Sequence, residues 1–148
     1  MTNKIKLKIV TLEKVVYEDL VESVDIPTTS GNIGILPNHT TLVSILSPGE
    51  IITEKKGEKH MMAVTGGFIE VRPKSEVVIM ADSAERIEEM NIEAIEKAKT
   101  RVEEILKDRQ NLEDFDFAHL EEALAREIAR LKIARKNSHR LRMPHVDK

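Results

Sequence analysis

The sequence contains neither cysteine nor tryptophan among its 148 residues. Without cysteine the chain cannot form disulfides, zinc-thiolate sites or a thiol nucleophile. Its aromatic residues are only Tyr17, Phe68, Phe115 and Phe117, too few for a surface that stacks nucleic-acid bases. No apolar run approaches the roughly 18 residues of a membrane span, and no signal-peptide pattern follows Met1. The remaining composition, 41% hydrophobic and 33% charged, is typical of a soluble globular protein.

Charge is distributed unevenly along the chain. From Arg126 to Lys148 there are eight Lys or Arg and two acidic residues, a local charge of +6, so residues 1–125 carry −9 of the total of −3. A basic end on an acidic body indicates an anionic partner: an acidic protein surface, a nucleic acid or an anionic membrane.

Glycine and proline lie almost entirely in the first half of the chain. Turn residues there separate short alternating or apolar runs, which predict strands. The runs are residues 5–9, 15–17, 21–26, 41–46, 50–53, 60–64, 68–71 and 77–81. Many short strands without helices between them favour an antiparallel sandwich or barrel. Gly66 and Gly67 indicate a tight turn or a close backbone approach at a strand end.

After residue 88 the apolar residues recur at helical spacing. One stripe comprises Ile92, Ile95, Ala98, Val102, Ile105 and Leu106, and a second comprises Phe117, Leu120, Leu124, Ile128 and Leu131. Asn91 and Asp116 are the expected N-caps, and a polar break from Lys107 to Asp114 is short enough for a helix hairpin. The expected fold is α+β with two domains: an antiparallel β-sandwich at residues 1–88, an antiparallel α-helical hairpin at 89–138, and a basic tail at 139–148.

Residue types that support catalysis are not gathered anywhere. The five histidines show no metal-pair spacing, no serine lies in a nucleophile-elbow context, and no phosphate-binding loop is present. We therefore expect a non-catalytic protein without cofactor or metal.

Two segments remain as candidates for function. The first runs from Gly31 to His39 and includes Asn32, Ile33, Gly34, Leu36 and Pro37. Its apolar residues either plug one end of the sandwich or contact another protein. The second is the basic group on the last helix: Arg126, Arg130, Lys132, Arg135 and Lys136. Complementing the helix dipole explains only the last turn of that group.

Several motifs resemble those of one family, the epsilon subunits of bacterial F-type ATP synthases. Gly31, Gly34, Leu36, Pro37 and His39 match its G-x-x-G-x-L-P-x-H signature. Residues 64–71 resemble its S-G-G-x-x-E-V strand, and residues 78–84 resemble its V-x-x-A-D-x-A segment. The Asp116-Phe117-Ala118 start of the last helix is also typical. The resemblance covers about residues 3 to 138.

The resemblance implies a rotor subunit at the cytoplasmic face of the cell membrane, attached only through its complex. In this family the sandwich binds the gamma subunit and rests on the ring of c subunits, and the loop matched by Gly31 to His39 lies toward that ring. The hairpin of these proteins can lie folded beside the sandwich or extend along gamma into the catalytic head of alpha and beta subunits, and when extended it inhibits ATP hydrolysis. Its basic face meets an acidic segment of beta, for which Arg126 and Arg130 match best, followed by Lys132, Arg135 and Lys136.

The sequence departs from the family at the hairpin. Members that bind ATP carry I-D-x-x-R-A, whereas this chain, aligned through Lys99 and Glu103, has Asn91 and Ala94 in place of the aspartate and arginine. A frame shifted to Ile92-Glu93 puts Glu96 at the arginine position, which also carries no positive charge. Since alanine cannot form the charge-assisted phosphate contact, we expect no tight ATP site; weak binding through Arg101, Arg126 and Arg130 stays open. At the loop, Asn32 replaces a common acidic residue, which questions a charged contact with the c ring.

A different class of function is a stand-alone module whose basic helix binds nucleic acid or an anionic membrane. The basic face has no interleaved aromatic residues for bases. It also lacks the tryptophan or broad apolar face that membrane insertion needs. A protein partner is therefore favoured over nucleic acid or direct membrane binding.

Overall fold

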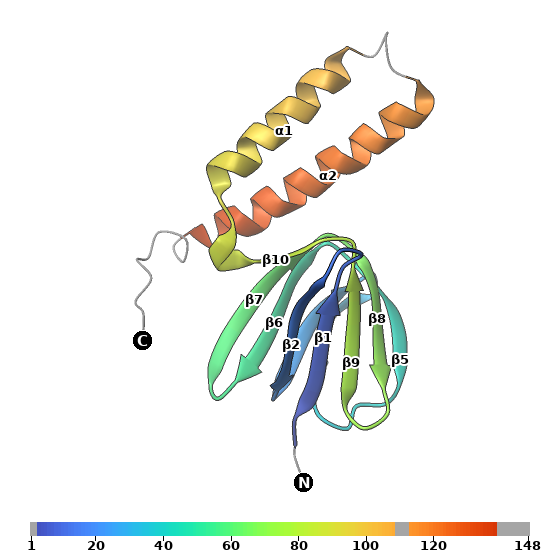
Figure 1. Cartoon of the computed structure of the whole chain (residues 1–148), viewed down its shortest axis with the longest axis vertical. Coiled ribbons are helices and arrows are strands. Elements are labelled where there is room, and N and C mark those ends of the chain that lie inside the picture. Colours follow the sequence, from blue (N-terminus) through green and yellow to red (C-terminus); the bar gives the residue numbers. More distant parts are fainter. Residues whose placement is uncertain (1–2, 109–112, 139–148) are drawn as a thin grey trace. The chain divides into compact units, whose positions relative to one another are not determined.

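The computed structural model describes residues 3–108 and 113–138. It divides into two units, Met1–Arg86 with the strands and Ile87–Lys148 with the helices (Figure 1). The basic tail expected at 139–148 and residues 109–112 of the expected break lie outside the described residues.

The first unit is a β-sandwich, as the turn-separated runs predicted. Its strands are β1 (Ile5–Val10), β2 (Val15–Val21), β3 (Ser23–Thr28), β4 (Gly31–Ile35), β5 (Leu42–Leu46), β6 (Gly49–Lys55), β7 (Glu58–Val64), β8 (Gly67–Arg72), β9 (Glu76–Ala81) and β10 (Ala84–Arg86). Pairing runs β10-β7-β6-β3-β5-β8-β9-β1-β2, with β4 beside β3. Strand β3 pairs with β5 at a single residue pair, Thr28 with Leu46. At this point the sheet divides into two layers.

The core lies between these layers. Alternation places Ile5, Leu7 and Ile9 of β1 inside, each 0% exposed, while the lysines between them face outward. Gly67 starts β8 directly against β9, and a Cβ there would lie 1.9 Å from the carbonyl oxygen of Met80. The close backbone approach predicted for this glycine pair is therefore present.

The sandwich differs from the expectation in three details. The pairing of β1 with β9 is parallel, whereas every other pairing of the described strands is antiparallel. Residues 31–35, predicted as loop, form β4, because they pair with β3 as a tight hairpin. The short strand β10 was not predicted, since three residues are too few to show an alternation.

The second unit is a hairpin of two helices, α1 (Ile92–Lys107) and α2 (Asp114–Lys136), after a short 3-10 turn at Ile87–Glu89. Asn91 caps α1 as predicted, since its side-chain oxygen accepts the backbone N–H of Ala94 at 3.1 Å. Arg135 near the end of α2 pairs with Glu96 near the start of α1 at 2.9 Å, as an antiparallel arrangement requires (Figure 1).

Two predictions for α2 are wrong. The cap is not Asp116: the helix begins at Asp114, with Glu113 at the N-cap position and no side-chain capping bond. Ile128 does not belong to the packed stripe, because its side chain is 48% exposed. The packed face is rotated by about one residue, so that Glu127 occupies the place expected for Ile128.

Candidate interaction surfaces

The segment from Gly31 to His39 is a strand followed by a tight turn. Gly31 has φ of 110°, a conformation that side chains disfavour, and Ile35 is buried. Leu36 directly after the strand is 64% exposed, whereas Ile33, Pro37 and His39 are half-buried. Ile35 therefore plugs the sandwich, and Leu36 is presented to solvent.

The turn is held in place by the β8–β9 connection. Asn38 has φ of 65°, and its backbone N–H donates to the hydroxyl of Ser75 at 2.7 Å. His39 bonds through Nδ1 to the carbonyl of Thr40 at 2.7 Å. These bonds fix the exposed turn, a favourable property for a contact surface because little freedom is lost on binding.

The basic residues of α2 differ in their surroundings. Arg126 and Lys132 are exposed, as is Lys136. Arg135 pairs with Glu96, and Arg130 pairs with Glu127 at 2.8 Å with a side chain only 24% exposed. Arg101, the remaining arginine considered for nucleotide, is exposed on α1. The basic group is thus a mixture of exposed cations and cations that already pair within the hairpin.

A row of apolar side chains crosses the outer face of the β5-β8-β9-β1-β2 layer. Adjacent residues pair directly across the strands: Ile45 with Phe68, Phe68 with Met80, Met80 with Val10, and Val10 with Val15. Ile45, Phe68, Met80 and Val15 are each 43–55% exposed. We call these five residues the apolar row. Clustered exposed apolar side chains make the apolar row a candidate surface for binding another protein.

The apolar row was not predicted from the sequence. Part of the row could have been found, because Phe68 and Met80 stand next to Ile69 and Ile79 in their strands. Neighbouring residues on a strand face opposite sides, so core positions for Ile69 and Ile79 place Phe68 and Met80 outside. The register that aligns the five strands could not be inferred from the sequence. Leu12, in the turn that joins β1 to β2, is also fully exposed close to Val15 in the chain.

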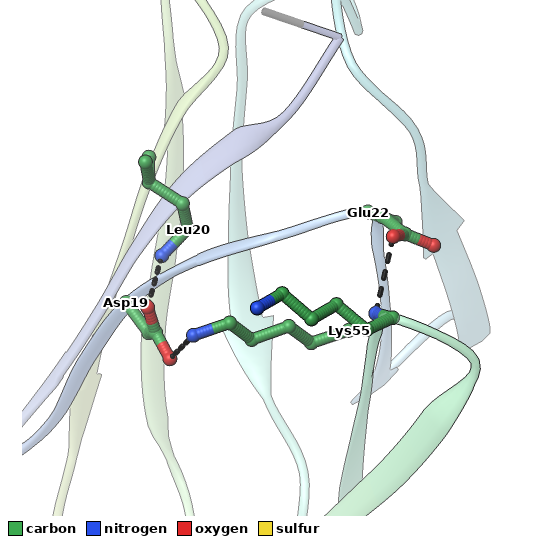
Figure 2. Close-up of polar contacts among 5 residues, drawn as sticks. Asp19, Leu20, Glu22 and Lys55 are labelled. Atoms are coloured by element: carbon green, nitrogen blue, oxygen red, sulfur yellow. Dashed lines mark hydrogen bonds and ion pairs between the residues drawn. The ribbon is translucent and has the colours of Figure 1, made fainter.

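The two layers are joined between β2 and β6. Figure 2 shows the Lys55 ammonium group donating to the Asp19 carboxylate at 2.6 Å, and the Leu20 backbone N–H donating to the same carboxylate at 2.8 Å. The backbone N–H of Lys56 donates to Glu22 at 3.1 Å. The bond from Lys55, with a smaller contribution from Leu20, lowers the pKa of Asp19 below its ordinary 3.8. The same bond raises the pKa of Lys55 above 10.5.

We expect Lys55→Met to lower stability at neutral pH but to have less effect in acid. A lowered carboxylate pKa gives stability above its ordinary value of 3.8, and this is lost as pH falls through the lowered value. Both side chains are about one-third exposed, so the loss is small. Urea denaturation should show a midpoint difference at pH 7 that shrinks below about pH 3.8. The control is Lys56→Met; a constant difference at every pH would contradict the expectation.

Two further features of the described residues bear on function. Within residues 3–108 and 113–138, no cluster of three or more histidine or acidic side chains is arranged to hold a metal ion. Neither helix, over that part of the chain, combines the length and apolar character needed to cross a bilayer.

Known proteins are similar to this chain over both of its units. Residues 4–87 match the beta-sandwich domain of the ATP synthase delta/epsilon chain. The ATP synthase epsilon chain of Herpetosiphon aurantiacus is 42% identical over 131 residues, covering 88% of this chain and 94% of that protein. The epsilon chain of Chloroflexus aggregans is 41% identical over 130 residues, covering 88% and 91%.

Solved structures give the same result for the fold. A chain in the Euglena gracilis mitochondrial ATP synthase (OSCP/F1/c-ring) aligns with a TM-score of 0.69 at 25% identity, covering 92% of this chain and 83% of that one. A chain in the Tetrahymena thermophila mitochondrial ATP synthase (central stalk/c-ring) aligns with a TM-score of 0.55 at 15% identity, covering 93% and 98%.

A sandwich followed by a helix hairpin, with the sandwich matched to delta/epsilon chains, defines a class of ATP synthase subunits. Within that class, the chain belongs to the ATP synthase epsilon chain family. It is thus a subunit of a membrane-associated complex and not one of the catalytic subunits.

Proposed function

We propose that this chain is a central-stalk rotor subunit that joins the gamma subunit to the c-subunit ring and inhibits ATP hydrolysis through its helix hairpin. The observation that carries the proposal is the apolar row on the outer face of the sandwich. A protein that worked alone would gain nothing from exposing Ile45, Phe68 and Met80 side by side. In this proposal the apolar row is the surface that binds gamma.

The turn after β4 supplies a second contact. Leu36 is exposed, and the bond from Asn38 to Ser75 holds the turn rigid. We assign the segment from Gly31 to His39, with Asn32, Ile33, Gly34 and Pro37, to the c ring. Because Asn32 is uncharged, this contact relies on apolar and backbone groups. Contact with the c ring places the subunit at the cytoplasmic face of the membrane, held by its complex.

The hairpin supplies the inhibitory contact in this proposal. Exposed Arg126 and Lys132 lie on α2, together with Arg130, Arg135 and Lys136, and an acidic surface on the beta subunit would complement them. Arg130 must exchange its bond with Glu127 for the new partner, and Arg135 must leave Glu96. Binding therefore competes with contacts inside the hairpin.

A tight ATP site in the hairpin is not part of this proposal. Asn91, at the place of the family's aspartate, uses its side-chain oxygen to cap α1. Ala94 has no charge to offer a phosphate group.

The test uses an ATP synthase complex from which the epsilon subunit has been removed. Adding the full chain should reduce ATP hydrolysis, and Arg126→Ala/Arg130→Ala should bind about two- to tenfold more weakly, because each exposed ion pair contributes little. The defect should be larger at about 50 mM than at about 300 mM salt, since salt screens exposed charges. The matched control is Lys97→Ala/Lys107→Ala, which removes two charges from α1. Equal inhibition by all three proteins at every salt concentration would refute the electrostatic contact.

A further inference from the structure

One face of α2 packs within the hairpin, and its residues are spaced three and four apart, as in a coiled-coil seam. The face comprises Phe117, Leu120, Leu124, Glu127, Leu131 and Ala134. Leu131 and Ala134 are buried, and the other four are half-buried. Glu127 therefore occupies the position between two leucines that this spacing assigns to an apolar residue.

If stability alone were selected, Ile128 would pack inside the hairpin and Glu127 would face solvent. The helix has the opposite arrangement. The side chain of Glu127 is only 14% exposed and accepts a bond from Arg130 Nη1 at 2.8 Å. The next residue, Ile128, is 48% exposed. A carboxylate thus lies on the packed face while the isoleucine next to it is about half exposed to solvent.

The facing helix has a matching interruption. The residues of α1 at the same spacing are Ile92, Ile95, Lys99, Val102 and Leu106. Ile95 is 1% exposed, whereas Lys99 is 34% exposed and pairs with Glu103 at 3.5 Å. We call the two faces together the hairpin seam. Each half of the seam carries one charged residue where an apolar residue would pack.

These charges make the hairpin seam weak. Partial burial removes hydration from a charged pair, and apolar residues of similar size usually pack at least as stably in its place. The Arg135–Glu96 pair does not compensate, because side chains about half exposed contribute little.

We infer that Glu127 with Arg130, together with Lys99, sets a low free energy for separating α1 from α2. This inference rests on the proposed function, in which the hairpin must open to inhibit. The Glu127–Arg130 pair is then a conformational control built into α2. Replacing it with apolar residues raises the free energy of opening, so that the hairpin stays closed more of the time.

The experiment measures hydrogen exchange of α1 and α2 amides in the full isolated chain. Glu127→Leu should slow exchange in both helices about tenfold relative to the unchanged chain, because opening becomes rarer. The matched control is Glu121→Leu, an exposed position on the same helix with the same change of charge and helix propensity. The double variant Glu127→Leu/Arg130→Met removes both charged members of the pair and is a second test.

Each result bears on the inference. Slower exchange for both Glu127 variants but not for Glu121→Leu supports it. Unchanged or faster exchange for both Glu127 variants, or equal slowing by Glu121→Leu, overturns it.

Inhibition by Glu127→Leu in the epsilon-depleted complex separates the inference from the proposed function. Glu127→Leu frees Arg130 for beta, which is a small gain because one exposed ion pair contributes little. Weaker inhibition is still expected if the hairpin must open, because opening becomes about tenfold rarer. Slow exchange with undiminished inhibition would overturn inhibition by extension and leave the weak hairpin seam intact.

Discussion

A chain truncated after residue 88 is expected to remain folded and to bind gamma, while ATP hydrolysis by the complex rises about fivefold or more. The folding expectation follows from the core, whose buried cluster extends only from Ile5 to Ala81. The increase in hydrolysis follows because both helices, and with them every candidate basic residue, are removed. The measurements are thermal unfolding of the truncated chain, its co-purification with gamma, and steady-state ATP hydrolysis by the reconstituted complex.

The control for this truncation is the full chain reconstituted in the same complex. If the truncated chain inhibited hydrolysis as strongly as the full chain, the hairpin would have no inhibitory role. If it unfolded, the sandwich would depend on the second unit, and the assignment of separate tasks to the two units would be wrong.

Phe68→Glu is expected to weaken association with gamma by about 30-fold or more, or about 2 kcal/mol, the loss typical of a central interface residue. Phe68 lies within the apolar row, between Ile45 and Met80, and is 55% exposed. A carboxylate there would have to lose its hydration in the bound state without gaining a partner. Because the side chain already faces solvent, the fold should be retained, which circular dichroism checks.

The matched control is Leu20→Glu, another exposed apolar position on the same layer but outside the apolar row. Leu20 is 46% exposed and pairs across the strands with Lys6, which can accommodate the new charge. Its affinity for gamma should change little. Equal loss in both variants would show general repulsion by added negative charge, and no loss in Phe68→Glu would exclude the apolar row as the gamma surface.

Local patterns were sufficient for much of the fold. Alternation in residues 5–9 and turns rich in glycine predicted strands, because side chains on a strand alternate between core and solvent. Asn91 was recognised as a cap because its short side chain satisfies a backbone N–H at the start of a helix. The motifs at residues 31–39, 64–71 and 78–84 indicated the family that the comparisons show.

Other features depended on contacts between distant residues. Residues 31–35 became β4 because β3 offered a partner, although their glycines and Asn32 favour a turn. The parallel pairing of β1 with β9 joins segments about seventy residues apart in the chain. In α2 the helical period was predicted correctly, but the packed face contains Glu127 where Ile128 was expected. The sequence could not separate these two choices, because faces of one helix that differ by a small rotation have similar apolar content.

The sequence by itself determined most of the strands, both helices, their order and the family to which they belong, because those properties depend on spacing between near neighbours. Tertiary structure alone decided which side chains meet. The apolar row exists only because the register aligns five strands, and the pairing of β2 with β6 through Asp19 and Lys55 exists only because the layers close. The absence of cysteine and the scarcity of aromatics excluded several kinds of chemistry; the register of the sheet and the rotation of α2 define the surfaces that remain.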